Sequence, residues 1–276
     1  MSDDPLQRGT PPGSLRYFAV LYAPGAARTL LSALYAFEAE VRDTARASTH
    51  DVAHTRLQYW RGEVDRLVAG KPGHPVTQAL RPLQECGADL SLLHEVLVAA
   101  DIDLAHVAIN DEDELAALAF RAAGAVQTLA AVASRNSPQL TDSEREFARR
   151  LGAAVAEVEW LRDLRGDAVA GRLRLPLDAL STASVEPANL LQEPMPASLA
   201  QLLAARKARL GAELQALGHV LSSAERSVHR QGLVLAALHA RLLDRVDHSA
   251  GIARTRAEVP PWTRFWVAWR TAIGHA

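Results

Sequence analysis

Apolar residues recur at helical spacing along the chain from Ser14 onward, and short breakers separate the helical stretches. Pro24-Gly25 and the GKPGHP segment at 70–75 are two such breakers. Thr141 followed by Glu144 forms a capping-box pattern, which predicts the start of a long helix. The predicted helices cover residues 14–23, from Pro24-Gly25 to about 47, 49–69, 75–84, 91 to about 105, 111 to about 134, 141 to between 166 and 171, 197–221, 222–248 and 262–273.

The composition agrees with a protein built from helices alone. Hydrophobic residues make up 49% of the 276 residues, and much of that share is alanine and leucine, which are strong helix formers. The N-terminal residues are acidic and then rich in proline and glycine, and the proline-containing stretch 175–196 is the longest without a helical pattern. We predict an all-α protein with a flexible leader over residues 1–13 and a single domain over residues 14–276.

Several classes of function are excluded by simple features. The net charge of −2 gives no reason to expect a nucleic-acid partner. Cys86 is the single cysteine, so the chain has no internal disulfide framework and no Cys-based zinc site. HExxH, GxSxG, Walker and dinucleotide-binding motifs are absent. The N-terminus lacks a signal-peptide pattern and no uncharged apolar run reaches bilayer length, so we expect a soluble, cytoplasmic protein.

Three carboxylates occupy one stripe of a predicted helix. Glu159, Asp163 and Asp167 are four residues apart, so their side chains lie on the same face. Carboxylates in helical register can hold Mg²⁺ bound to substrate phosphates, but three acids also occur on ordinary solvated faces. Apolar neighbours such as Trp160 and Leu164 argue for a polar-lined cavity or a buried ion pair. The pattern alone leaves these interpretations open.

A second group of charged residues lies in the segment YAFEAEVRDTAR, residues 35–46. Arg42 and Arg46 are four residues apart on one helical face, and Asp43 lies beside them. Glu38 and Arg42 form another pair at this spacing. By itself this is the charged stripe of any long helix, and it indicates no particular chemistry.

Four segments follow one another in the order and spacing of a known set of motifs. They are ALYAFEAEVRDTAR at 33–46, YWRGEVDRLVAGKPGHPVTQAL at 59–80, FRAAGAVQ at 120–127 and LGAAVAEVEWLRDLRGDAVAGRLRLP at 151–176. The first is similar to ALYAFCRxVDDxxD, and the last is similar to LGxAxQxxNxLRDxxxDxxxGRxYLP. Together the four segments resemble the squalene/phytoene synthase family. The resemblance runs from about Ser14 to the C-terminal helix and weakens after Pro176.

The resemblance implies the isoprenoid-synthase fold, a helical bundle around a deep central cavity. In active family members, two Asp-rich motifs face each other across the cavity mouth. They hold Mg²⁺ that bridges to prenyl diphosphates, which ionise and couple head to head. Carried over residue by residue, this makes Asp163, Asp167 and Tyr35 candidate catalytic residues. Asp163 and Asp167 are also the candidate metal ligands if Mg²⁺ is still bound.

The first Asp-rich motif departs from the family pattern. Arg42 and Arg46 stand at its metal-facing positions, and only the middle Asp43 is retained. Other expected residues are replaced as well: the upstream arginine by Ala39, a glutamine by Ala156, an asparagine by Glu159 and a late-helix tyrosine by His239.

Guanidinium–carboxylate pairing is strong and often bidentate, so arginines on this wall could neutralise the opposite stripe without metal. We therefore predict a salt-bridge or ligand-binding cluster of Arg42, Arg46, Asp43, Glu159 and Arg162.

Three functions follow as hypotheses. The substitutions favour a prenyl-lipid-related binding or assembly protein in which Mg²⁺-dependent head-to-head transfer is impaired or lost, with no cofactor expected. The retained Asp163 and Asp167 favour the alternative, an active prenyltransferase that condenses two prenyl diphosphates with Mg²⁺. A metal-free binder of a prenyl phosphate lies between the two.

The last predicted helix contains PPWTRFWVAW, which begins at Pro260 and includes three tryptophans. Tryptophan is enriched at membrane interfaces, so this segment is a candidate for peripheral membrane contact. Ordinary helix packing explains the same pattern, and from the sequence we favour it.

Overall fold

The computed structural model describes residues 4–46, 49–248, 252 and 255–274. All regular structure among these residues is helical, which confirms the all-α prediction. The longer helices are α1 (Leu15–Leu21), α2 (Arg28–Ala45), α3 (His50–Val68), α6 (Leu92–Leu104), α7 (Glu112–Ala119), α8 (Ala125–Arg135), α9 (Asp142–Val169), α11 (Ala197–Val220), α13 (Arg230–Arg245) and α14 (Pro261–Gly274).

Short helical segments connect the longer helices. They are η1 (Pro5–Arg8), η2 (Gly25–Ala27), α4 (Pro75–Gln78), α5 (Arg81–Glu85), the π-helical η3 (Phe120–Gly124), α10 (Leu177–Thr182), η4 (Pro187–Leu191) and α12 (Ser223–Val228). The predicted helix 75–84 is therefore two short helices, and the predicted helix 222–248 is interrupted at His229. The stretch 175–196, predicted to be irregular, contains α10 and η4.

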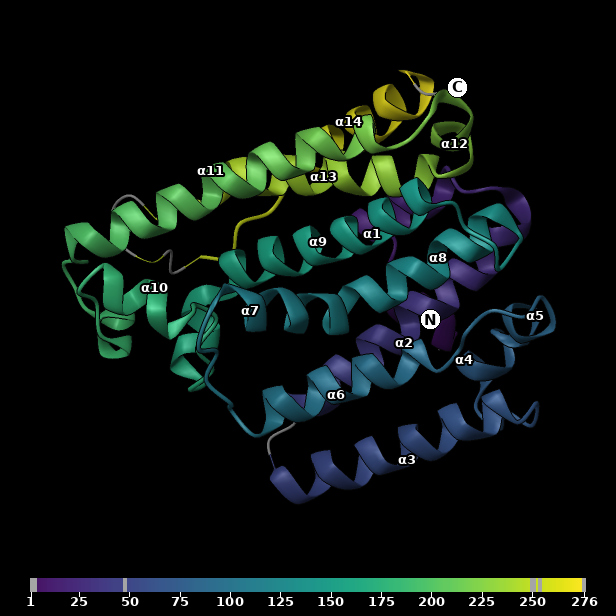
Figure 1. The fold of residues 1–276 in the computed structure, drawn as a ribbon, viewed down its shortest axis with the longest axis horizontal. Coiled ribbons are helices and arrows are strands. Elements are labelled where there is room, and N and C mark those ends of the chain that lie inside the picture. Colours follow the sequence, from purple (N-terminus) through teal and green to yellow (C-terminus); the bar gives the residue numbers. More distant parts are fainter. Residues whose placement is uncertain (1–3, 47–48, 249–251, 253–254, 275–276) are drawn as a thin grey trace.

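The helices pack side by side, with α9 near the middle of the bundle and α3 and α11 at opposite sides (Figure 1). Local sequence signals explain where several of them begin. The Thr141 backbone N–H donates to the Glu144 carboxylate (2.8 Å), and the Glu144 N–H donates to the Thr141 hydroxyl (3.2 Å), so the predicted capping box is present. Ser14 caps α1 by accepting a hydrogen bond from the Tyr17 N–H (3.1 Å).

The segment before α1 differs from the flexible leader predicted over residues 1–13. Its described part, from residue 4 onward, packs against α2 through η1. Gly9 explains the close approach, because a Cβ at this position would lie 2.0 Å from the carbonyl carbon of Tyr35. An ion pair joins Arg8 to Glu40 of α2. Composition favoured a mobile leader here, but it gave no signal for these contacts with α2.

The Trp-Arg…His-Pro segment forms a turn around one buried carboxylate. Oε1 of Glu63 on α3 accepts hydrogen bonds from the backbone N–H groups of Gly73 (2.6 Å) and His74 (2.7 Å), and the Thr77 hydroxyl also donates to it. Burial alone would raise the pKa of Glu63, but these donors and Arg66 lower it to about 2. This block of the sequence therefore has a structural role, which is to fasten α4 to α3.

The run from α7 through α8, Glu112–Arg135, is a core element. It is the one helical run among the described residues that is long and apolar enough to cross a membrane, but 67% of its most apolar window is buried inside the bundle. Its π-helical segment packs closely on α9, where a Cβ on Gly152 would lie 2.4 Å from the Cα of Gly124. The close approach of η3 and α9 brings small residues to the wall of a cavity.

Candidate functional site

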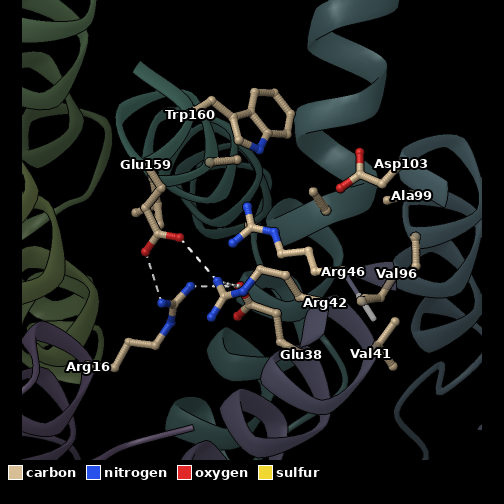
Figure 2. Close-up of a pocket in the computed structure, with 15 residues that line it drawn as sticks. Arg16, Glu38, Val41, Arg42, Arg46, Val96, Ala99, Asp103, Glu159 and Trp160 are labelled. Atoms are coloured by element: carbon tan, nitrogen blue, oxygen red, sulfur yellow. Dashed lines mark hydrogen bonds and ion pairs between the residues drawn. The ribbon is translucent and has the colours of Figure 1, made fainter. Parts of the chain in front are cut away.

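A cavity lies between α2, α6, η3 and α9 (Figure 2). Charged side chains from α1, α2, α6 and α9 line it together with small apolar side chains such as Ala99 and Ala123. Its volume is about 50 Å³. On this scale a water molecule needs about 10–15 Å³, so the cavity has room for a few waters. The family resemblance predicted a deep central cavity, and the cavity between these described helices is small in this conformation.

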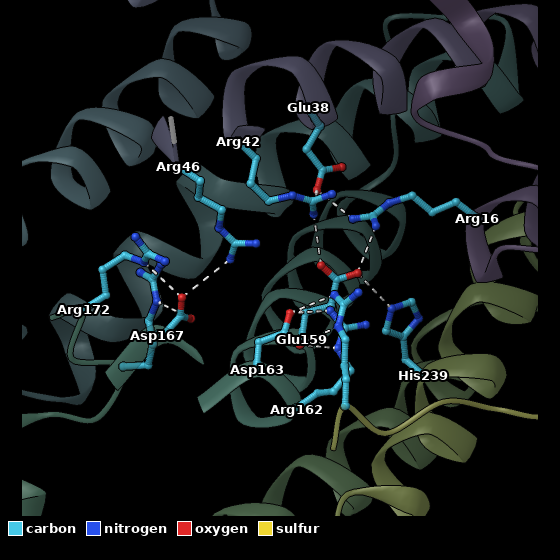
Figure 3. Close-up of polar contacts among 12 residues, drawn as sticks. Arg16, Glu38, Arg42, Arg46, Glu159, Arg162, Asp163, Asp167, Arg172 and His239 are labelled. Carbon is cyan, nitrogen blue, oxygen red and sulfur yellow. Dashed lines mark hydrogen bonds and ion pairs between the residues drawn. The ribbon is translucent and has the colours of Figure 1, made fainter. Parts of the chain in front are cut away.

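Five residues form a buried network beside the cavity: Arg16, Glu38, Arg42, Glu159 and His239 (Figure 3). The Arg16 guanidinium donates to Glu38 (2.6 Å) and to Oε1 of Glu159 (2.9 Å). Arg42 donates to the other oxygen of Glu159 (3.2 Å) and lies 3.7 Å from Glu38. Nε2 of His239 on α13 lies 3.5 Å from Glu159. The network thus links α1, α2, α9 and α13 through one carboxylate.

The two carboxylates of the buried network differ electrostatically. Burial alone would raise the pKa of Glu159, but Arg16, His239 and Arg42 together hold it well below its ordinary value. Burial raises the pKa of Glu38, and the same arginines offset only part of that effect. Its Oε2 atom is buried and has no hydrogen-bond partner among the described protein atoms. Glu159 is therefore firmly ionised, whereas Glu38 holds a proton more readily.

Tyr35, the predicted catalytic tyrosine, lies under this network and does not line the cavity. Its ring is 1% exposed and its centroid lies 5.5 Å from the guanidinium carbon of Arg16, within cation–π range. The Gln127 side-chain amide donates to its hydroxyl (3.1 Å), and burial raises its pKa to about 12. The contacts give Tyr35 a positioning role for Arg16 in this conformation.

Asp163, the next acid of the stripe, is held by two arginines. Arg162 and Arg256 each donate two hydrogen bonds to its carboxylate, at distances of 2.6–2.8 Å and 2.8–2.9 Å. Burial would raise the pKa of Asp163, but these bonds hold it below its usual value. The Arg256 side chain is 59% exposed, so this pair lies at the edge of the protein.

Asp167 is 2% exposed and is surrounded by arginines. Arg172 donates to Oδ1 (3.0 Å), Arg174 donates to Oδ2 (3.2 Å), and Arg46 lies 3.7 Å from Oδ1. Arg174 also makes a bidentate pair with Asp103 of α6 (2.6 and 2.8 Å). Burial lowers the pKa of Arg46, and Asp167 offsets this only in part. The positive charge of Arg46 is therefore only partly balanced by the negative charge of Asp167.

A second, larger pocket opens to solvent at this end of α9. We call it the open pocket; its volume is about 550 Å³, and it is lined by Arg46, Arg162, Asp163, Arg165, Gly166, Asp167, Val169, Arg172 and Arg256. Five arginines and two aspartates give it a clear excess of positive charge. Arg46 lines both the open pocket and the cavity. Such a concentration of guanidiniums is suited to binding an anionic group such as a phosphate.

The donor set does not fit Mg²⁺. A magnesium site needs carboxylate oxygens that are available for coordination, but guanidiniums already engage both oxygens of Asp163 and of Asp167. The facing positions on α2 carry Arg42 and Arg46, which would repel a cation. Among the described residues, no group of three His, Cys, Asp or Glu side chains is placed to hold a metal.

Comparison with known proteins identifies the family. The model of the squalene/phytoene synthase family matches residues 12–264. The chain belongs to the squalene/phytoene synthase family.

Sequence relatives of this squalene/phytoene synthase-family protein include three named phytoene synthase. One, from Arthrospira platensis, is 32% identical over 146 residues, which are 49% of this chain and 47% of that protein. Another, from Mycobacterium tuberculosis, is 28% identical over 171 residues, which are 61% of this chain and 55% of that protein. The chain thus spans about half the length of the curated relatives that it matches.

Solved structures show the same fold. A dehydrosqualene synthase superposes with a TM-score of 0.79 at 17% identity, with 94% of this chain and 90% of that chain covered. A squalene synthase from Alicyclobacillus acidocaldarius superposes with a TM-score of 0.74 at 17% identity, with 87% and 91% covered. The predicted isoprenoid-synthase bundle is therefore confirmed for this squalene/phytoene synthase-family protein.

The structure brings most of the predicted cluster together, but with different partners. Arg42 pairs with Glu159 and Arg46 pairs with Asp167, and neither pairs with Asp163, which Arg162 and Arg256 engage instead. Asp43 was predicted in this cluster, but it is exposed on α2, and no ion pair found between described residues includes it. One helical position separates it from Arg42, a rotation of about 100° that turns it away from α9.

Sequence reasoning missed four arginines of the site, namely Arg16, Arg172, Arg174 and Arg256. Arg174 had a readable signal, because it stands where the GRxYLP pattern of the family has tyrosine. Arg172 is the arginine of that same pattern, so its position was known but its partner Asp167 was not. Arg16 and Arg256 lie 143 and 93 positions from the carboxylates they contact, and no motif marks them.

Proposed function

We propose that this protein binds a phosphorylated isoprenoid, or a related anionic prenyl lipid, through arginines and without Mg²⁺. We further propose that it does not condense two prenyl diphosphates, so that a binding or assembly role replaces catalysis. The observation that carries this proposal is the pairing of Arg42 with Glu159 and of Arg46 with Asp167. Both arginines stand where the family pattern has metal-facing aspartates, so guanidiniums supply the positive charge that Mg²⁺ supplies in that pattern.

Two further observations support the proposal. The open pocket has an excess of positive charge and is large enough for a phosphate or diphosphate headgroup. The cavity, with about 50 Å³, has no room in this conformation for two prenyl chains beside each other. Membership of the family supports a prenyl chain as the apolar part of the ligand.

An active prenyltransferase is the second candidate. Asp163 and Asp167 retain the positions of the second Asp-rich motif, and three sequence relatives are named phytoene synthase. This alternative requires the arginines to release both aspartates when substrate and Mg²⁺ enter.

Calorimetric titration with farnesyl diphosphate, in Mg²⁺ and in EDTA, distinguishes the two candidates. We expect equal affinity in both buffers and no condensation product when organic extracts are analysed by mass spectrometry. Binding that requires Mg²⁺, or turnover to a C–C coupled product, contradicts the proposal and supports the prenyltransferase.

The variant Arg46→Ala tests the role of the open pocket. Loss of one charge-assisted hydrogen bond to a phosphate costs about 1.5–3 kcal/mol, so we expect affinity to fall by about tenfold or more. Arg149→Ala is a matched control, because Arg149 pairs with Glu146 on the surface and does not line the open pocket. If Arg46→Ala binds as tightly as the control, the headgroup does not bind at Arg46.

A further inference from the structure

The C-terminal helix α14 exposes a stripe of large apolar side chains. Trp262, Phe265, Trp266, Trp269 and Ile273 are 85%, 50%, 48%, 47% and 56% exposed. Their spacing of three or four residues places them on one side of the helix. We call this set the aromatic stripe. From the sequence we favoured ordinary helix packing for these tryptophans, and their exposure shows that this interpretation was wrong.

A different face of α14 provides its attachment to the bundle. Val267, Ala268 and Ala272 are buried, and α14 packs on α13 and α1 through this side. Arg264 secures the N-terminal end of the helix by donating to the carbonyl oxygen of Gly13 (2.7 Å). Small buried side chains therefore hold the helix against the bundle, while its bulky aromatic side chains are exposed. The helix lies near the C-terminal end of the described chain (Figure 1). A protein that buried its tryptophans for stability would show the reverse arrangement.

The charge of α14 indicates what the aromatic stripe contacts. The helix contains two arginines and no aspartate or glutamate. The Arg270 guanidinium lies 5.1 Å from the centre of the Trp266 ring, so an exposed cation sits over one ring of the stripe. Tryptophan and arginine together suit the boundary between headgroups and acyl chains, where the rings bury apolar surface and the guanidiniums contact lipid phosphates.

A groove of mixed polar and apolar lining lies beside the stripe, with Gln215, Arg241 and Asp244 among its polar residues. It lies between α11, α13 and α14, has a volume of about 530 Å³, and is open to solvent. Its lining includes small residues such as Gly211, Gly218 and Ala236, together with Trp266 and Arg270 of α14. Trp266 belongs to the stripe and also lines the groove, so the two surfaces adjoin.

We propose that α14 is a membrane-docking helix whose aromatic stripe inserts into the interface of a bilayer that contains anionic phospholipids. Tryptophan is enriched at bilayer interfaces, and an exposed apolar patch of this kind marks an interaction site. The absence of acidic residues from α14 complements a negatively charged lipid surface. This proposal is independent of the ligand in the open pocket.

Vesicle flotation with the full chain tests the proposal. We expect the protein to bind vesicles made of equal parts phosphatidylcholine and phosphatidylglycerol, with a blue shift of tryptophan fluorescence. The triple variant Trp262→Ser, Phe265→Ser, Trp269→Ser should bind at least about tenfold more weakly, because it removes most of the inserted apolar surface. Arg270→Gln should weaken binding to these vesicles by about fivefold and leave binding to pure phosphatidylcholine unchanged.

A matched control is Val52→Ser, Val68→Ser, Val107→Ser, which alters three residues that are 46%, 50% and 53% exposed outside α14. It should bind as the unmodified protein does, and circular dichroism melts should confirm that both triple variants fold. Failure of the unmodified protein to bind anionic vesicles overturns the proposal, as does equal binding by the two triple variants. Self-association that the α14 variant abolishes, without vesicle binding, would assign the stripe to a second copy of the chain and also overturn it.

Discussion

The acids of the carboxylate stripe on α9 are paired in two kinds of surroundings: Glu159 lies in the buried network, which we call the buried end, and Asp163 lies at the open pocket, which we call the open end. At Glu159 the partner Arg16 is 12% exposed, whereas at Asp163 the partner Arg256 is 59% exposed. At the buried end two carboxylates share two guanidiniums and a histidine, and at the open end arginines outnumber aspartates. The ion pairs at Glu159 thus hold helices together, whereas the arginines around Asp163 form a positively charged surface that can bind an anion.

The difference shows how burial decides the role of an ion pair. A buried pair cannot lose one partner without leaving an uncompensated charge in a medium of low dielectric constant. An exposed pair exchanges its partner for water or for a bound anion at little cost. We therefore expect substitutions in the buried network to act on stability, and substitutions in the open pocket to act on ligand binding.

The largest effect on stability is expected for Arg16→Ala. This change removes the guanidinium that bridges Glu38 and Glu159, and breaking a buried pair in this way costs about 3–5 kcal/mol. The free energy of unfolding, measured by urea denaturation, should fall by that amount. A loss no greater than that of an exposed arginine variant would show that the two ends of the stripe are equivalent.

A smaller effect is expected for the pH dependence of stability that Glu159 contributes. Its folded pKa lies well below the ordinary value of 4.5, so protonation favours the unfolded chain. The contribution is complete above 4.5 and is lost as the pH falls toward the folded pKa. The denaturation midpoint of the unmodified protein should therefore fall on acidification below 4.5, and less steeply in Glu159→Gln. Parallel curves for the two proteins would contradict this assignment.

The smallest effect on stability is expected for Arg256→Ala. The Arg256 side chain is 59% exposed, although its partner Asp163 is only 17% exposed, and solvent-exposed pairs contribute about 0–1 kcal/mol. Arg162 still donates two hydrogen bonds to Asp163 in this variant, so the aspartate is not left without a partner. The difference in unfolding free energy should shrink further in high salt. A loss comparable to that of Arg16→Ala would remove the distinction between the buried and open ends.

Much of the fold was predictable because helical periodicity and capping are local signals. The capping box at Thr141 and the break at Pro24-Gly25 placed helix boundaries to within a few residues. The packed segment before α1 was not predictable, because its contacts depend on Gly9 meeting the backbone of α2. The composition of a segment indicates whether it is ordered in isolation. It does not show that the segment packs against a helix distant in the sequence, as this one does against α2.

The site was predictable only as far as the motifs reached. The stripe and the arginines at positions 42 and 46 gave the correct kind of interaction, a carboxylate–guanidinium cluster. The pairing of individual residues depended on where helices cross, and Arg16 and Arg256 reach the stripe from segments that carry no motif. The exposure of the tryptophans on α14 depended on which helical face packs, and a helix that is apolar on both faces does not reveal this.

The buried network also limits how this sequence can change. Replacing Arg42 alone by aspartate would set a third carboxylate beside Glu38 and Glu159 while removing one of their two guanidiniums. The intermediate would therefore be less stable than the protein before or after a compensating change at Glu159. An aspartate at position 42 is therefore compatible with this network only together with a compensating change at Glu159.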